Sequence, residues 1–252
     1  MYQFVVISAC DERRHKMIKQ CNEFNILNQT IFLDNPSTIG NSESYFPINE
    51  TMINKKVMCC ARSHLRALEL ASKDESPDFT IILEDDVAFH KTKFVDGINE
   101  IINNWDKITQ NSSLKMISVG WVPCNKYDHY SDIPPCYKMK TISGVNILNN
   151  RYIVGTQAYI VKKTDMKKHS TLFGHSSYNE LENAIHSLNK QLSTMAIDCY
   201  INRIFKQCYT FPPLAIEQDT TSLLRDYNFQ RSYWNNFFKD IEHVMKEYWS
   251  YD

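Results

Sequence analysis

The strongest constraint on the fold lies in residues 80–87, which read TIILEDDV. Four apolar or branched residues lead directly into the acidic triplet 84–86, and Val87 then restores the apolar character. This pattern predicts a buried β-strand whose C-terminal end carries concentrated negative charge. The fold must therefore deliver three carboxylates to one edge of a sheet.

These adjacent carboxylates repel one another, and a desolvated carboxylate that is neither paired nor bound to a metal is costly. A divalent cation held where the strand leaves the sheet would compensate the charge. Mg²⁺ or Mn²⁺ would suit the place, because hard cations prefer oxygen ligands. An acidic loop that is simply solvated explains the triplet equally well, so the pattern by itself leaves both interpretations open.

The N-terminal residues predict a strand-helix-strand unit. Residues 2–8 form the expected first strand, residues 11–21 a helix with an acidic start, and residues 29–33 the second strand. This order indicates an α/β fold with parallel strands, in which ligands bind at the carboxyl ends of the strands. Arg13 and Arg14 would lie at that edge, either as ligands of a phosphate or nucleotide or as solvated residues of a helix start.

Residues 57–72 predict a strong amphipathic helix, since apolar side chains recur there at three- and four-residue spacing. His64 lies on or beside the buried stripe, where a hydrogen-bonded core histidine is more common than a ligand. Pro77 closes the helical segment and the acidic strand follows at once. The helix and the strand therefore form one α-β unit.

Several later segments carry candidate functions. Residues 123–150 show no clear period and are expected to form an irregular binding loop. Gly155 opens a predicted strand, where a glycine lets a backbone approach a ligand closely. Asp198 is a lone acid between apolar residues, either a helix cap or a catalytic group, and capping is the more common case. Aromatic residues at helical spacing over 227–249 predict a helix that covers the core, with a dimer face or a membrane-surface contact as the alternatives.

Length, charge and cysteine usage exclude several classes of protein. We expect one domain over residues 1–252 that ends in an aromatic amphipathic helix over 223–252. The net charge of -1 leaves no basic excess for a nucleic acid partner. No apolar run approaches the roughly 20 residues of a membrane span, and no secretory signal is visible, so we expect a cytoplasmic protein. The 8 cysteines show no paired CxxC spacing, which favours reduced thiols over a zinc or disulfide framework.

Four segments in a fixed order together resemble the motifs of glycosyltransferase family 25. That family includes the lipopolysaccharide-type galactosyl- and glucosyltransferases and the collagen galactosyltransferases. The resemblance extends from residue 2 to about residue 222. The four segments are CARSHL at 60–65, ILEDDV at 82–87, GTQAYIV at 155–161 and ID at 197–198.

The resemblance implies a GT-A-type fold, a nucleotide-sugar-binding Rossmann-like sandwich with a mainly parallel central sheet. It implies transfer of a hexose, galactose or glucose, from a UDP-sugar to a hydroxyl of a glycan or protein acceptor, with inversion. The metal would be Mn²⁺ or Mg²⁺, with Glu84 and Asp86 as its ligands, and it would neutralise the charge of the departing diphosphate.

The resemblance also assigns residues to the donor site and to catalysis. Inversion requires a carboxylate that deprotonates the acceptor hydroxyl, and Asp198 takes this role, with Glu217 as the second candidate. Gln218 and Ser222 would close over the diphosphate. The residues expected to bind the donor are Arg13, His64, Asp85, Gly155, Thr156, Gln218 and Ser222.

Two other classes of function compete with this interpretation. A nucleotidyltransferase or phosphohydrolase could place acids at a strand end, but no glycine-rich phosphate loop supports it. A catalytically silent protein that binds carbohydrate or nucleotide sugar could keep the same fold. The intact acidic triplet argues against it, because a silent copy has no need of a repulsive cluster.

Overall fold

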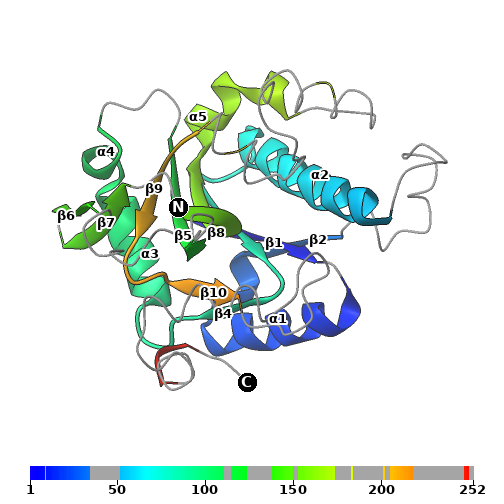
Figure 1. The fold of residues 1–252 in the computed structure, drawn as a ribbon, viewed down its shortest axis with the longest axis horizontal. Helices are drawn as coiled ribbons and strands as arrows, with labels where there is room; N and C mark the ends of the chain where they lie inside the picture. Colours follow the sequence, from blue (N-terminus) through cyan, green and yellow to red (C-terminus); the bar gives the residue numbers. More distant parts are fainter. Residues whose placement is uncertain are drawn as a thin grey trace, which may run out of the picture.

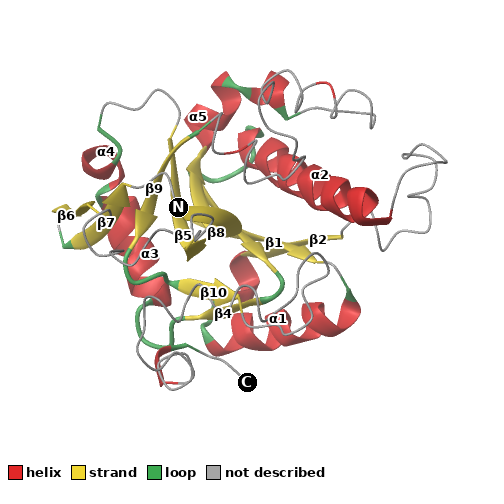
Figure 2. Cartoon of the chain, in the orientation of Figure 1, coloured by secondary structure: helices red, strands yellow, loops and turns green. Residues whose placement is uncertain are grey.

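The computed structural model describes part of the chain in detail. The described residues are 1–8, 10–34, 52–110, 115–123, 138–142, 144–149, 153–173, 183, 201, 205–217 and 247–249. They form a sheet with helices packed against both of its faces (Figures 1 and 2).

The described strands belong to one sheet of mixed direction. Its main path has the order β2-β1-β3-β8-β5-β9-β7-β6, and β10 pairs with both β4 and β5 beside this path. Along the path β8 is antiparallel to β3 and β5, and β7 is antiparallel to β9 and β6, so the other six strands of the path share one direction. The strands are β1 Tyr2–Ser8, β2 Thr30–Asp34, β3 Phe79–Glu84, β4 Val87–Phe89, β5 Lys115–Pro123, β6 Lys138–Ile142, β7 Val145–Asn149, β8 Ile153–Lys162, β9 Lys206–Thr210 and β10 Ala215–Glu217.

The helices divide between the two faces of the sheet. Figure 1 shows α2 and α5 together on one side and α1 and α3 on the other. The α-helices are α1 Asp11–Glu23, α2 Met52–Ser72, α3 Phe94–Asn103, α4 Trp105–Ile108 and α5 Lys163–Lys168, and the short 3-10 helices are η1 Leu27–Gln29 and η4 Ser170–Leu172.

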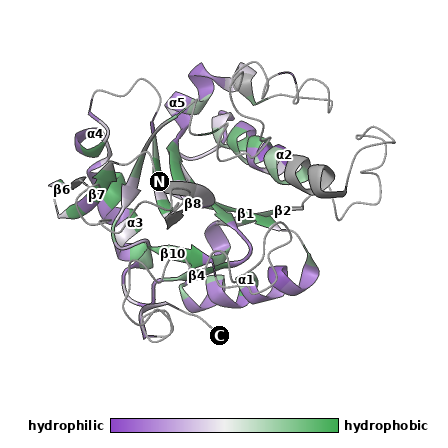
Figure 3. Ribbon diagram, viewed as in Figure 1, coloured by the Kyte–Doolittle hydropathy of each residue, from purple (hydrophilic) through white to green (hydrophobic). Residues whose placement is uncertain are grey.

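The central strands are buried on both faces and alternate between two apolar clusters. In β1, Phe4 and Val6 pack with residues of α1 and α3, whereas Val5 and Ile7 pack with residues of α2. In Figure 3, β1, β4 and β10 are coloured as hydrophobic and α1 as mainly hydrophilic. The expected α/β sandwich with a mainly parallel central sheet is therefore confirmed, as is the strand-helix-strand start.

One expectation was wrong. Within the segment 123–150, expected to be irregular, the structure forms the antiparallel pair β6 and β7, with Ile142 opposite Val145. These strands are short and rich in polar residues, so their periodicity is weak, and β6 lies at the end of the strand order. Their stability comes from pairing, since β7 also bonds to β9.

The C-terminal helix expected over 223–252 lies almost entirely outside the described residues. Of this tail the structure describes 247–249, where Trp249 is buried and forms an isolated antiparallel β-bridge with His90. None of the helices within the described part of the chain is long and apolar enough to cross a membrane. The single domain, the cytoplasmic location, the dimer and the membrane-surface contact stay predictions.

Candidate functional site

Parallel pairing brings the acidic triplet next to the start of α1. In the register of β1 and β3, Ile7 lies opposite Glu84. Both strands therefore end at the same edge of the sheet, and the chain leaves β1 directly into α1. The expected meeting of arginine and carboxylates at the carboxyl edge follows from this register.

Arg13 forms a buried ion pair with the acidic triplet. Its Nη1 lies 3.1 Å from Oδ2 of Asp86 and 3.8 Å from Oδ1 of Asp85. All three side chains are less than 10% exposed, so this ion pair is shielded from water. Loss of one partner of a buried ion pair destabilises the folded protein, so Arg13 stabilises the acidic edge as long as no other cation lies beside Asp86. Arg14, in contrast, places its guanidinium over the ring of Phe32, 5.2 Å from the centroid.

Gln20 holds α1 against β4, and no role was predicted for it from the sequence. Its Nε2 donates to the carbonyl of Val87 at 2.9 Å, and its Oε1 accepts from the N–H of Phe89 at 2.6 Å. Gln20 is two turns after Arg13 on the same face of the helix. A polar residue at a buried position of that face, beside Met17 and Cys21, was the signal that could have found it.

Glu84 is oriented by two further elements. Its Oε1 lies 3.2 Å from Nε2 of His64 on α2 and accepts a 2.8 Å hydrogen bond from Oγ1 of Thr156 on β8. The other ring nitrogen of His64, Nδ1, lies 3.0 Å from the hydroxyl of Tyr159. His64 is fully buried, so it is both a hydrogen-bonded core group and a neighbour of the acidic edge.

The two outer acids of the triplet have opposite electrostatic environments. Burial raises the pKa of Asp86 well above its usual value, the carboxylates of Glu217 and Glu84 raise it further, and the charge of Arg13 only partly opposes them. Burial alone would raise the pKa of Glu84 too, but the hydrogen bond and charge of His64, the Thr156 hydrogen bond and Arg13 outweigh it and lower this pKa. Glu84 is thus held as an anion, whereas the charge of Arg13 compensates Asp86 only in part.

The residues present fit a divalent cation at Asp86. Its Oδ1 is buried and accepts no hydrogen bond. A buried carboxylate oxygen without a donor is costly, and so is the repulsion from neighbouring acids. One cation beside Asp86 would satisfy both needs.

Glu217 reaches this cluster through β10. It pairs with Val87 in the antiparallel register of β10 and β4, directly beside Asp86. The close approach of β10 depends on Gly120, because a Cβ there would lie 2.9 Å from the Cβ of Ala158 and 3.0 Å from the carbonyl of Ala215. The second candidate base therefore lies against the acidic triplet.

Gly155 has a structural requirement of its own. Its φ is +109°, a conformation that residues with side chains rarely adopt, and a Cβ would lie within van der Waals overlap of Oε1 of Gln157. This conformation leads the chain into Thr156, whose hydroxyl holds Glu84. A contact of Gly155 with the donor stays a prediction.

Three predicted residues lie outside the described part of the chain, namely Asp198, Gln218 and Ser222. The described residues therefore place Arg13 and the acidic triplet together with one of the two candidate bases, Glu217.

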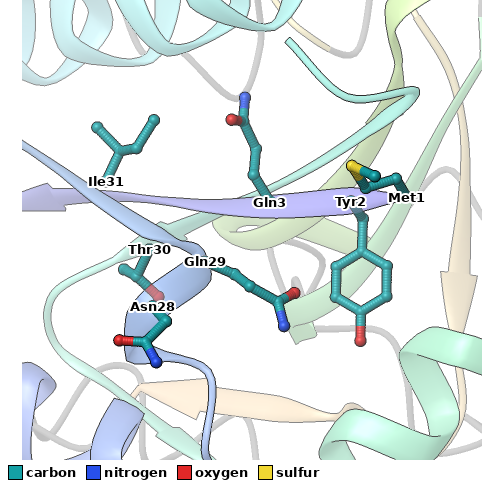
Figure 4. A pocket seen from close by; sticks show the side chains of 7 residues that line it. All are labelled: Met1, Tyr2, Gln3, Asn28, Gln29, Thr30 and Ile31. Atoms are coloured by element: carbon teal, nitrogen blue, oxygen red, sulfur yellow. The ribbon is translucent and has the colours of Figure 1, made fainter.

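A hollow of about 510 Å³ lies at the opposite edge of the sheet (Figure 4). Its lining residues are Met1, Tyr2, Gln3 and residues 28–31. Tyr2 pairs with Phe79, the first residue of β3, whereas the acids follow the last residues of that strand. Because ligands of parallel sheets bind at the carboxyl ends, this hollow is not part of the acidic site.

A comparison with solved structures gives distant matches, among them these three. The galactosyltransferase LgtC, in complex with donor and acceptor sugar analogues, has a TM-score of 0.41 and 10% identity, covering 93% of this chain and 96% of that one. A197 from STIV also has a TM-score of 0.41 and 10% identity, covering 83% and 81%. A glycosyltransferase involved in glycosylation of the major capsid of PBCV-1 has a TM-score of 0.37 and 8% identity, covering 91% and 99%. Because these TM-scores are low, the family of the chain is not inferred from these structures.

The sequence itself decides the family. No curated protein matches the chain. The family described as "Glycosyltransferase family 25 (LPS biosynthesis protein)" matches residues 1–199, most of the chain, and the α/β sandwich agrees with the GT-A-type fold expected for that family. The protein belongs to glycosyltransferase family 25 and is a glycosyltransferase.

Proposed function

We propose that the protein transfers a hexose, galactose or glucose, from a UDP-sugar to a hydroxyl of a glycan or protein-linked acceptor, with inversion and with Mn²⁺ or Mg²⁺ as cofactor. The proposal is supported by a buried acidic cluster at the carboxyl edge of the sheet in a chain of this family. The observation that carries the metal dependence is Asp86, whose Oδ1 is buried without a donor among neighbouring acids.

Asp86 is the principal candidate ligand, with Glu84 or Asp85 beside it. Such a cation, when bound, neutralises the negative charge that develops on the leaving diphosphate. The hydrogen bonds from Thr156 and His64 fix the orientation of Glu84 before any ligand arrives. This preorganisation reduces the entropy that ordering the site would otherwise cost.

Arg13 would serve the donor rather than the metal. In the structure its guanidinium supplies the positive charge next to Asp86. A guanidinium matches phosphate oxygens well, and a cation at Asp86 would compete with it for the carboxylate. Arg13 would then be available for the diphosphate.

Two carboxylates remain candidates for the base. Asp198 is our first choice, from its place in the family motif, and Glu217 is the second. A base variant should lower kcat while metal and UDP binding persist, whereas a ligand variant should lose metal binding. Comparison of Asp198→Asn with Glu217→Gln by calorimetry and kinetics separates these roles.

The function is tested by nucleoside-diphosphate release from a panel of nucleotide sugars, with Mn²⁺ or with chelator. We expect release from one UDP-hexose only with metal, and a loss of about 100-fold or more in Asp86→Asn. Asp106→Asn is the matched control, because this exposed carboxylate pairs with Lys162 at the other edge of the sheet.

Donor-induced thermal stabilisation is measured on the same samples. Metal-dependent stabilisation without release, even with acceptor glycans present, would favour the silent sugar-binding protein. Release that persists in chelator, or in a folded Asp86→Asn variant, would overturn the metal assignment.

A further inference from the structure

A second group of metal-ligating side chains lies behind the acidic edge. Cys60, His64 and Glu84 each offer a ligand atom, and these three atoms lie within 4.8 Å of one another. Cys60 and His64 are four residues apart on α2, so their side chains share one face of the helix, and Glu84 ends β3. His64 is buried, whereas Cys60 and Glu84 are partly exposed, which gives an ion access from solvent.

The separations are close to those of a tetrahedral zinc site. Bond lengths of about 2.3 Å to sulfur and about 2.1 Å to nitrogen or oxygen place neighbouring ligand atoms roughly 3.4–3.6 Å apart. Nε2 of His64 and Oε1 of Glu84 are 3.2 Å apart already. Because no pair exceeds 4.8 Å, the thiol of Cys60 needs to close by only about 1.2 Å, a rotamer-scale adjustment.

Tyr159 contacts the ring nitrogen of His64 that does not face Glu84. Its hydroxyl lies 3.0 Å from Nδ1 of His64, and its ring stacks with the imidazole at 5.7 Å between centroids. Metal-bound histidines use their second ring nitrogen for such a hydrogen bond, which fixes the tautomer and turns the first nitrogen toward the metal. Here the first nitrogen is Nε2, and it points to Glu84.

We propose that Cys60, His64 and Glu84 form a centre for a thiophilic divalent cation of the Zn²⁺ class. Three protein ligands leave the fourth position open, and the sulfur ligand selects against Mg²⁺ and Mn²⁺. The centre is thus chemically different from the all-oxygen place at Asp86, although Glu84 lies in both.

Zinc at this centre would bind Oε1 of Glu84 and so hinder Glu84 from binding the catalytic cation at Asp86. This consequence, inhibition by zinc, rests on the proposed function, whereas the binding does not. The binding is therefore tested first, on the full chain and without any donor.

The binding test uses Co²⁺ as a spectroscopic probe of thiolate ligation. We expect one equivalent of Co²⁺ to give a thiolate-to-cobalt charge-transfer band in the wild type and in Cys10→Ser, a control in which an exposed thiol is removed. The band should be absent in Cys60→Ser, and in Cys60→Ala if the serine variant does not fold. Equimolar Zn²⁺ should displace it and excess Mg²⁺ should not.

The role of Tyr159 gives an independent readout. Removal of such a hydrogen-bonding partner typically weakens metal affinity about 10–100-fold, and we expect Tyr159→Phe to do so. A wild type without the band, or a band of equal strength in the Cys60 variants, overturns the proposal. The same holds for a band that Mg²⁺ displaces as readily as Zn²⁺.

The functional arm follows the binding test. Zn²⁺ should inhibit Mn²⁺-supported diphosphate release in the wild type and in Cys10→Ser, but at least tenfold less in Cys60→Ser. Equal inhibition of all three overturns the regulatory consequence. If no diphosphate is released at all, the proposed function fails while the cobalt result still decides the metal centre.

Discussion

Replacement of Gln20 by methionine tests how α1 is held at the site. The side chain of Gln20 is 6% exposed, and its amide bonds both the carbonyl of Val87 and the N–H of Phe89. These two groups belong to the edge of β4 that faces away from β10. Gln20→Met keeps the length and helix propensity of the side chain but removes the donor and the acceptor.

The magnitude follows from the burial of β4. Val87 and Phe89 are 0% exposed, so water cannot replace the amide of Gln20. Leaving a buried backbone group without such a partner costs about 1–3 kcal/mol, and two groups give about 2–5 kcal/mol after allowance for the apolar gain of methionine. For a chain of this size, we expect a fall in Tm on the order of 5–15 °C.

The assay is thermal and urea unfolding, with Gln29→Met as the matched control. The side chain of Gln29 is exposed, so the same replacement there should change stability by less than about 0.5 kcal/mol. Gln20→Met should also weaken donor-induced stabilisation, because Arg13 is on the same helix face. A Tm equal to that of the control would refute the two-bond attachment of α1.

Three further predictions concern charge, backbone and thiol chemistry. Arg13→Gln removes the cation paired with Asp86, so calorimetry should show tighter Mn²⁺ binding and weaker UDP binding. Weaker binding of both would contradict the proposal that the metal ion replaces Arg13 beside Asp86 and that Arg13 then binds the diphosphate. Gly155→Ala forces a side chain into a φ of +109° and should cost about 1–3 kcal/mol in urea unfolding, and an unchanged midpoint would show that the backbone relaxes there. Burial raises the pKa of the Cys21 thiol to about 11, so at pH 8 only about one molecule in a thousand carries its thiolate. Alkylation followed by mass spectrometry should label the exposed Cys10 first and Cys21 only as the pH approaches 11; equal rates at pH 8 would be inconsistent with that burial.

Local patterns were sufficient for the scaffold. The apolar runs of residues 4–7 and 81–83 predicted strands, and the order of strand, helix and strand predicted that they are parallel. The register that puts Ile7 opposite Glu84 did not follow from these runs, because a strand that is apolar on both faces can shift by one residue without exposing an apolar side chain. The strands β6 and β7 escaped prediction, because their sequences are weakly periodic and β7 also pairs with β9, which is far along the chain.

The sequence alone placed an arginine and three acids near the carboxyl ends of the parallel strands, since each occupies a fixed place on a strongly patterned element, and the family resemblance added His64. Only the tertiary structure decided which of them touch. Arg13 contacts Asp86 across 73 residues because β1 pairs with β3. Thr156 contacts Glu84 across 72 residues because β8 lies antiparallel between β3 and β5. The packing of α1 on β4 is held by the side chain of Gln20, and the pairing of β10 with β4 brings Glu217 beside Asp86. Such contacts depend on how separate elements pack, and local periodicity carries no information about packing between elements.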